Sequence, residues 1–344
     1  METFAIVGTG GIAKTHASAI KSIKEATLLA CYNHNTEKAK AFAKEFSCTS
    51  YDSLDELLGD KRIDTIVITT PSGAHLDTAI KALESGHDIM VEKPLEVTLE
   101  RCNEINEVAK RCNRRVGVIF QNRYFSSIQE VKKALTEGRF GTLVLASAVL
   151  PVFRSQAYYD SAPWRGTKKL DGGGVLMNQG IHTVDLMQYL AGDVSSLSAY
   201  TALLTHENIE VEDTASIALK FTSGALGSIT ATTSAYSGYP RRIELYGTEG
   251  SVILENELIT RWDFKVEKEE DALIKERYSK SEASFTSNNS PDVDYMCHKR
   301  EYEDYISSKR DNKPFTLDGV EGEKAVRIIE AIYKSAKEER SISL

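Results

Sequence analysis

The first 121 residues alternate short, continuously apolar runs with amphipathic helical segments, and this alternation constrains the fold more than any other feature. A run without polar alternation predicts a strand buried on both faces, as in a parallel sheet covered by helices. The helical segments show matching periodicity, with Leu76, Ala79 and Leu83 at i, i+3 and i+7. We therefore expect a doubly wound parallel sheet over residues 1–121. Its predicted strands cover residues 3–8, 26–32, 63–70, 89–91 and 116–120.

From residue 122 onward, apolar and polar residues alternate in longer segments that are joined by glycine-containing turns. This pattern predicts mostly antiparallel strands with one covered and one open face. The expected fold class is α/β plus α+β. An N-terminal Rossmann domain (1–121) precedes an open-faced sheet domain flanked by helices (122–344), and the helix at 320–338 is a candidate for packing back on the first domain. We expect strands at 142–152, 194–205, 214–221, 225–235, 242–246 and 251–254, helices at 126–138, 175–190, 293–308 and 320–338, and a charged loop at 267–291.

Composition argues against several classes of partner. The 344-residue chain has 42 Lys and Arg against 50 Asp and Glu, a net charge of −8 that disfavours nucleic acid and anionic membranes. We find no apolar run of roughly 18 residues, the length of a membrane span, and no signal-peptide pattern. The five cysteines are scattered and odd in number, which is typical of thiols in a reducing cytosol. We expect a cytoplasmic protein without a bound metal.

The segment Gly8-Thr9-Gly10-Gly11-Ile12-Ala13 fits G-x-G-x-x-A between the first predicted strand and the first predicted helix. Gly8 allows a tight turn, Gly10 leaves room for a pyrophosphate, and Ala13 lets the helix approach the strand. The amides at the helix start then face the phosphates. This setting predicts NAD or NADP as the cofactor, with contacts from Gly8, Gly10, Gly11 and Ile12.

The second predicted strand ends in Asn33, where NAD-binding proteins usually carry an acidic residue for the ribose hydroxyls. Asn33 can bind a hydroxyl without repelling a phosphate, and His34 and Lys38 can neutralise a 2′-phosphate. The segment therefore permits NADP and slightly favours it, although Asn33 also suits NAD. Thr36 is expected to cap the helix that follows.

Glu92-Lys93-Pro94 follows the predicted strand at 89–91, at the carboxyl edge of the sheet where a nicotinamide ring is expected. Burial and a positive nicotinamide both lower the pKa of a lysine in such a place, which suits proton transfer near neutral pH. We predict that Lys93 is catalytic; a solvated surface lysine is the alternative. Further cofactor contacts are expected from Thr70, Pro71, His75, Glu92, Lys93 and Gln121. His75 could equally be a structural cap.

A second glycine-rich segment, Gly172-Gly173-Gly174, opens the predicted helix at 175–190. Three glycines let the backbone pack close to a ligand or to another strand. Asn178 and His182 are four residues apart, which would place them on one face of that helix. Two polar side chains on an otherwise apolar helix favour a catalytic and substrate-binding role over a buried structural histidine.

The loop before this segment holds Tyr158, Trp164 and Arg165. Aromatic rings stack on the apolar faces of sugars, and Arg165 can bind a hydroxyl or an acid group. Arg123, at the junction of the two predicted domains, can contact the same substrate. The alternative is an aromatic loop that only fills the domain interface.

These elements together resemble the glucose-fructose oxidoreductase / inositol dehydrogenase / MocA-like (Gfo/Idh/MocA) family over nearly the whole chain. The motifs that carry the resemblance are the glycine turn, Glu92-Lys93-Pro94, Gln121-Asn122-Arg123, Pro163-Trp164-Arg165-Gly166 and the segment 172–182. The resemblance implies an NAD(P)-dependent dehydrogenase or reductase of sugars, inositols or nucleotide sugars. It also implies that Lys93 is the catalytic lysine and His182 the catalytic histidine.

One departure from the family pattern concerns Asn178, because many inositol-type members carry Asp at this place. An amide can position a hydroxyl or the imidazole but cannot relay a proton, so proton transfer falls to Lys93 and His182. Members that act on nucleotide sugars can also carry Asn.

The resulting hypothesis is an NAD(P)-dependent oxidoreductase of a sugar, cyclitol or nucleotide sugar, with Lys93 and His182 converging beside the nicotinamide. A glycosidase of the same fold and a non-catalytic sugar or cofactor sensor are the alternatives, and the presence of both residues argues against the sensor. Small and β-branched residues at 231–234 predict a flat sheet face for a homodimer or homotetramer. Substrate identity, reaction direction and the choice of cofactor do not follow from the sequence.

Overall fold

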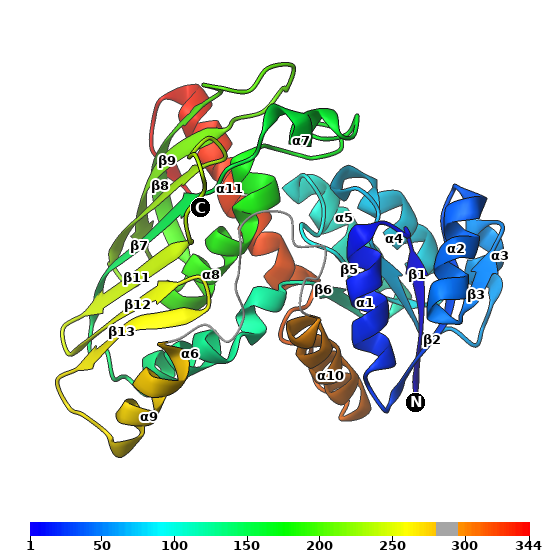
Figure 1. Cartoon of the computed structure of the whole chain (residues 1–344), viewed down its shortest axis with the longest axis horizontal. Helices are drawn as coiled ribbons and strands as arrows, with labels where there is room; N and C mark the ends of the chain where they lie inside the picture. The colour runs from blue at the N-terminus through cyan, green and yellow to red at the C-terminus, as the bar shows by residue number, and fades with distance from the viewer. Residues whose placement is uncertain (280–294) are drawn as a thin grey trace. The chain divides into compact units, whose positions relative to one another are not determined.

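The computed structural model describes residues 1–279 and 295–344, and the contacts within it divide the chain into two compact units (Figure 1). The first unit comprises residues 1–121 and 295–326, and the second comprises residues 122–279 and 327–344. The sequence pattern predicted two consecutive ranges, whereas the stretch 295–326 groups with the first unit. Within the described residues, no helix combines the length and apolarity needed to cross a membrane.

The first unit contains a six-stranded parallel sheet in the order β3-β2-β1-β4-β5-β6. The strand order reverses on either side of β1, so the predicted doubly wound sheet is confirmed. Strands β4 and β5 are buried along their whole length, as their unbroken apolar runs require. The strands are β1 (Glu2–Val7), β2 (Ala26–Tyr32), β3 (Thr49–Tyr51), β4 (Thr65–Ile68), β5 (Asp88–Val91) and β6 (Val116–Val118).

Helices of the first unit begin where side chains satisfy their first amides. Asn35 accepts a hydrogen bond from the Lys38 amide and caps α2, so the predicted cap Thr36 is wrong by one residue. Helix α1 packs against α10, and α4 packs against α5. The helices are α1 (Gly11–Lys21), α2 (Thr36–Phe46), α3 (Leu54–Gly59), α4 (His75–Glu84), α5 (Leu99–Cys112), α10 (Met296–Arg310) and the first part of α11 (Gly319–Glu338).

The second unit contains an eight-stranded sheet in the order β13-β12-β11-β7-β10-β9-β8-β14. Its pairs are antiparallel except β7 with β10, which are parallel. The strands are β7 (Leu143–Pro151), β8 (Val194–Ala202), β9 (Thr214–Phe221), β10 (Leu226–Thr232), β11 (Arg242–Gly247), β12 (Gly250–Glu255), β13 (Leu258–Phe264) and β14 (Ile342–Ser343). The helices are α6 (Ser126–Thr136), α7 (Gln156–Asp160), α8 (Ile181–Ala191) and α9 (Glu269–Tyr278).

One face of this sheet is open and carries apolar side chains. Leu145 of β7 pairs with Leu226 of β10, and the two are 40% and 58% exposed, while Ala146 and Ala148 are buried. The prediction that residues 231–234 all form the open face is wrong for Ala231 and Thr233, because successive strand residues point to opposite faces and only Thr232 and Ser234 are partly exposed. Ala231 and Thr233 are buried.

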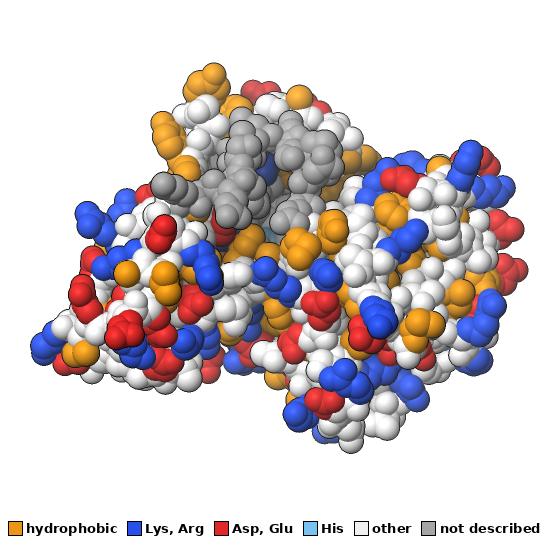
Figure 2. All heavy atoms as spheres, turned by 60° about the horizontal axis from the view of Figure 1, so that its bottom comes forward, with side chains coloured by type: hydrophobic (Ala, Val, Ile, Leu, Met, Phe, Trp, Pro, Cys, Tyr) orange, Lys and Arg blue, Asp and Glu red, His pale blue; other side chains and the backbone are white. Residues whose placement is uncertain are grey.

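Two predicted segments differ from the structure. The expected loop at 267–291 contains α9 over Glu269–Tyr278, and residues 280–291 lie outside the described part. The expected helix at 175–190 is two pieces, a π-helical turn at Val175–Gln179 and α8 from Ile181. Over the surface seen in Figure 2, acidic and basic side chains are interspersed.

Candidate cofactor-binding and proton-transfer site

The glycine turn joins the carboxyl end of β1 to α1. Gly8 has φ +97°, and a Cβ there would lie 2.8 Å from the backbone of Thr69, so this position requires glycine. No atom lies within 4 Å of the place that a Cβ would take on Gly10 or Gly11, which leaves their side of the turn open, next to Ile12 at the start of α1. The turn therefore fits the pyrophosphate of a dinucleotide, held by the first amides of α1.

Asn33 ends the second strand beside this turn. Its amide donates to Thr9 Oγ1 at 2.9 Å, and its carbonyl accepts from the Asn35 amide at 2.9 Å. Both contacts fix the side chain where the ribose of a bound dinucleotide is expected. His34 and Lys38 are exposed and stay predicted contacts.

His75 is buried and bridges two segments at the carboxyl edge of the sheet. Nδ1 lies 3.0 Å from the Pro94 carbonyl, and Nε2 lies 3.0 Å from the Thr70 carbonyl. Burial lowers the pKa of His75, so the ring is neutral and ties the end of β4 to the segment after Lys93. This arrangement supports the structural alternative for His75; Thr70 and Pro71 remain predicted cofactor contacts.

Glu92, at the end of β5, is buried among polar side chains. Oε1 lies 2.8 Å from His16 Nε2 of α1, and Oε2 accepts the Lys93 amide at 3.0 Å. Burial is the largest single influence on the pKa of Glu92 and raises it, but the hydrogen bond from His16 and the electrostatic effects of His16, His298 and Lys93 together lower the pKa to about 2. Glu92 is therefore an ionised carboxylate next to Lys93 at the strand end, and its contact with a cofactor stays a prediction.

His16, Glu92 and His298 bring three ligand-type atoms within 4.8 Å of one another. Tetrahedral zinc with bonds near 2.0–2.2 Å spaces its ligand atoms about 3.3 Å apart. Here one pair is at 2.8 Å, a hydrogen bond, and His298 Nε2 is 4.0 Å from the carboxylate. The group is thus a hydrogen-bonded pair with a third ring beside it, and its spacing does not fit a formed metal centre.

In the second unit, Gly173 and Gly174 of the run at 172–174 pack against protein. A Cβ on Gly174 would overlap the Glu212 carbonyl oxygen, and one on Gly173 would overlap Tyr333 Oη. Of the two alternatives predicted for this run, approach to a ligand or to another segment, the structure supports the second. Glu212 then accepts hydrogen bonds from the amides of Gly174 and Leu176.

Asn178 and His182 do not share one α-helical face. Asn178 lies in the π-helical turn, and His182 lies in the first turn of α8, after Gly180. Gly180 is required at this break, since a Cβ there would lie 2.7 Å from the Val175 carbonyl. The Asn178 amide donates to Asp171 Oδ1 at 2.7 Å, so a buried carboxylate orients it.

The aromatic loop gathers two guanidinium groups around one ring. The Arg165 guanidinium lies 4.1 Å and the Arg154 guanidinium 5.3 Å from the centre of the Tyr158 ring. Arg165 also lies 4.6 Å from the Trp164 ring. Stacking of this kind orients an arginine over an aromatic ring. Sequence reasoning missed Arg154, which no motif marks.

Arg123 is engaged elsewhere. It is 3% exposed, forms a bidentate pair with Asp185 of α8, and stacks on Tyr189. A buried pair of this quality fixes α8, the helix that carries His182. This position argues against the predicted substrate contact for Arg123. Gln121 lies in the short 3₁₀ turn Gln121–Tyr124 that precedes α6.

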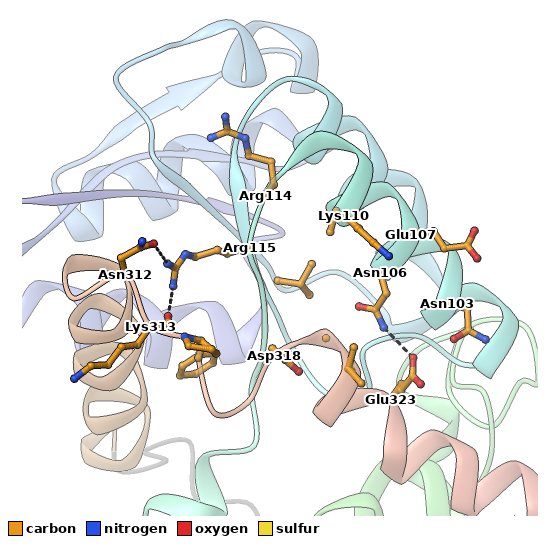
Figure 3. Close-up of a pocket in the computed structure, with 16 residues that line it drawn as sticks. Asn103, Asn106, Glu107, Lys110, Arg114, Arg115, Asn312, Lys313, Asp318 and Glu323 are labelled. Carbon is orange, nitrogen blue, oxygen red and sulfur yellow. Dashed lines mark hydrogen bonds between the residues drawn. The ribbon is translucent and has the colours of Figure 1, made fainter.

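A cavity of about 610 Å³ in the first unit lies away from the glycine turn (Figure 3). It borders α5, the start of β6 and the start of α11, and Asn106 there donates to Glu323 at 2.8 Å. Because Val116 begins β6 and Val7 ends β1, the cavity is at the amino edge of the parallel sheet and the turn is at its carboxyl edge. Ligands of such sheets bind at the carboxyl edge, so this cavity is not the cofactor site.

Comparison with known proteins assigns the chain to a family. Residues 3–120 match the profile described as "Oxidoreductase family, NAD-binding Rossmann fold", and residues 128–253 match the "GFO/IDH/MocA C-terminal domain". Inositol 2-dehydrogenase of Rhizobium meliloti is 26% identical over 350 residues, covering 99% of this chain and 98% of that protein. The two profiles together span most of the chain.

Solved structures give the same assignment. The WlbA dehydrogenase of Bordetella pertussis, in complex with NADH and UDP-GlcNAcA, has a TM-score of 0.89 and 32% identity, covering 100% of this chain and 97% of that chain. The WlbA dehydrogenase of Chromobactrium violaceum, also in complex with NADH and UDP-GlcNAcA, has a TM-score of 0.90 and 34% identity, covering 100% of this chain and 96% of that chain. The predicted family is confirmed: this protein belongs to the Gfo/Idh/MocA family of NAD-dependent oxidoreductases.

Proposed function

We propose that this protein is an NAD-dependent dehydrogenase that oxidises a ring hydroxyl of a UDP-linked sugar acid. The observation that carries the proposal is the full-length similarity, at 32–34% identity, to two WlbA dehydrogenases bound to NADH and UDP-GlcNAcA. The inositol dehydrogenase matched over the same length is 26% identical.

The charge of the aromatic loop supports an anionic substrate. Arg154 and Arg165 flank Tyr158, and both guanidinium groups keep their charge. A UDP-sugar acid is negative at its pyrophosphate and at its carboxylate, whereas an inositol is neutral. A loop with two stacked arginines can form charge-assisted hydrogen bonds with a UDP-sugar acid but has no charged group to bind on an inositol.

In the proposed reaction, Lys93 accepts the proton of the substrate hydroxyl as a general base, and His182 holds or exchanges that proton. Asn178, oriented by Asp171, positions a hydroxyl through its amide. NAD, when bound, supplies the hydride acceptor. Trp164 binds the sugar by stacking, Tyr158 holds the arginines in place, and Arg165 binds the acid group of the sugar.

A substrate panel tests the proposal. UDP-GlcNAcA, UDP-GlcNAc, myo-inositol and glucose 6-phosphate are each offered with NAD and with NADP, and nicotinamide absorbance is recorded. We expect turnover with UDP-GlcNAcA and NAD, and about 100-fold or greater loss in Lys93→Met with NADH binding retained. Turnover of myo-inositol but not of UDP-sugars would reject the substrate class. Cleavage of a glycosidic bond without net NADH would favour the glycosidase of the same fold.

The proposal includes a cytosolic homodimer or homotetramer formed through the open sheet face of the second unit. Support comes from Leu145, Val149, Tyr200 and Leu226, which are 40–79% exposed. A cluster of this kind on a flat sheet suits burial against a second copy. Leu226→Glu should yield monomers in sedimentation equilibrium, and an unchanged mass would exclude this face.

A further inference from the structure

A hydrogen-bonded chain of buried side chains runs behind the end of β5. Tyr302 of α10 lies 2.7 Å from His16 Nδ1, and His16 Nε2 lies 2.8 Å from Glu92 Oε1. The other carboxylate oxygen of Glu92 accepts the backbone amide of Lys93 at 3.0 Å. His16 and Tyr302 have no exposed surface, and Glu92 is 7% exposed.

The direction of these bonds follows from the chemistry of the partners. An ionised carboxylate only accepts, so His16 donates from Nε2. Burial raises the pKa of Tyr302 well above its ordinary range, so its hydroxyl stays protonated and can donate to Nδ1 or accept from it. The two contacts fix the His16 ring and aim its Nε2 proton at Glu92.

Glu92 contacts the backbone of Lys93, and the two residues also interact electrostatically. The other titratable groups facing Glu92 are His16 from α1, His298 and Tyr302 from α10, and His75 from α4. Burial and the neighbouring His16 lower the pKa of His298 to about 3, so its ring is neutral. Glu92 and His16 are thus the two groups of this cluster that are joined by a hydrogen bond at the strand end.

We propose that His16 and Glu92 are positioning residues for the lysine of the proton-transfer step. By holding the Glu92 carboxylate ionised against the Lys93 amide, His16 fixes the strand end and keeps Lys93 basic enough to accept the proton of the hydroxyl. The inference rests on the proposed role of Lys93. Because His16 lies on α1, whose first turn faces the predicted phosphate site, one helix serves both the cofactor and the lysine.

The test measures the titration of Lys93 itself and needs no substrate. Lys93 in the full-length protein is labelled with acetic anhydride over a range of pH, and its acetylation is quantified by mass spectrometry against free lysine. The variants are Glu92→Gln, His16→Leu, His16→Gln and Tyr302→Phe. The matched control is His87→Gln, a buried histidine of the same unit whose nitrogens face the backbone carbonyls of Ile63 and Leu58.

In Glu92→Gln the apparent pKa of Lys93 should fall by about 0.5 or more, because a nearby negative charge is removed. His16→Leu should lower it in the same direction, since Glu92 then loses its donor and is more easily protonated. His16→Gln, which keeps a donor, should restore most of the wild-type value, and Tyr302→Phe should cause a smaller change. A purely structural role would lower the melting temperature of these variants without moving the titration.

The inference is overturned if Lys93 titrates identically in wild type and Glu92→Gln, or if His16→Leu shifts it no more than His87→Gln does. These outcomes are separate from the fate of the proposed function. If Lys93→Met retains turnover, the assignment of Lys93 fails whatever its titration shows. If Lys93→Met is inactive while Glu92→Gln leaves the titration unchanged, only the positioning role fails.

Discussion

The two glycine-rich segments of the chain have opposite physical roles. At residues 8–11, Gly8 packs tightly on Thr69, but Gly10 and Gly11 face open space. At residues 172–174, Gly173 and Gly174 abut Tyr333 and the Glu212 backbone, and no room is left beside them. Glycine therefore makes space for a ligand in the first segment and for the protein's own atoms in the second. A glycine run in a sequence does not by itself distinguish these uses.

Each unit also contains a buried carboxylate, Glu92 in the first and Glu212 in the second, and their pKa values are shifted in opposite directions. Glu92 has its pKa held at about 2, because the hydrogen bond from His16 and the electrostatic effects of its neighbours together outweigh burial. Glu212 has its pKa raised by burial, which its hydrogen bonds from Gly174, Leu176 and Tyr333 only partly offset. The first carboxylate is a fixed charge beside the lysine proposed for proton transfer, and the second is an anchor for a backbone turn.

The largest effect is expected from Gly174→Ala. A Cβ that overlaps a backbone carbonyl oxygen forces the two segments apart, which should cost about 3 kcal/mol or more and lower the melting temperature by about 6 °C or more. Gly59→Ala is the control, since no atom lies within 4 Å of its Cβ position. The melting temperatures are measured by calorimetry. Equal values for Gly174→Ala and Gly59→Ala would show that Gly174 is not required for close packing against Glu212.

Gly10→Ala should act on binding and leave stability alone. The added methyl group occupies the open side of the turn, where NADH phosphates are expected, so NADH affinity should fall about 10- to 100-fold. Its melting temperature without cofactor should stay within about 1 °C of wild type.

Gly8→Ala should instead reduce stability. We expect a loss of about 1–3 kcal/mol in the free energy of unfolding, because Gly8 has a φ of +97° and contacts Thr69. Calorimetric titration with NADH measures the affinity of each variant, and thermal unfolding without cofactor measures the stability of each.

Lowering the pH below about 6.5 should reduce the stability of the first unit, which contains His298. Folding lowers the pKa of His298 from 6.5 to about 3, so the unfolded chain binds more protons between these values. Stability should then fall by up to about 1.4 kcal/mol for each pH unit below 6.5. His298→Gln should flatten the melting temperature measured from about pH 7 to about pH 5. Parallel curves for wild type and variant would contradict this.

Glu212 should show the reverse dependence. Its folded pKa is raised, so its contribution to stability is full below the ordinary value of 4.5 and is lost as the pH rises through the folded pKa.

The smallest effect is expected from Tyr333→Phe. Loss of the hydroxyl that donates to Glu212 should cost about 1 kcal/mol, without changing NADH affinity. The same change should partly rescue Gly173→Ala, whose Cβ would overlap that hydroxyl oxygen. A double-mutant cycle by urea denaturation measures the coupling. Strict additivity would show that Gly173 does not serve the Tyr333 contact.

Local pattern was sufficient for much of the first unit. Continuous apolar runs predicted β4 and β5, and the glycine turn predicted where a strand would meet a helix. Short elements were missed: β3 spans only Thr49–Tyr51 and has almost no periodicity to detect. In the second unit, the apolar spacing that predicted one helix at 175–190 continues across Gly180, where packing against Val175 breaks it.

The candidate site residues also differ in whether a local sequence pattern marks them. Lys93 was found because proline and an apolar strand mark its position in sequence, and its role is still a proposal. Arg123 was expected at a substrate, but Asp185, 62 residues later, holds it in a buried ion pair. Arg154 and His16 were overlooked because neither belongs to a motif. Their significance lies in partners that only folding brings near.

The sequence by itself determined the parallel sheet, the glycine turn, the open-faced second sheet and the family, because these depend on periodicity and short-range spacing. The tertiary structure alone decided which polar groups meet: Glu92 with His16 across 76 residues, and Gly174 with Glu212 across 38. Burial makes such meetings decisive, since a carboxylate removed from water must be hydrogen-bonded or lose its charge. No local pattern encodes that choice of partner.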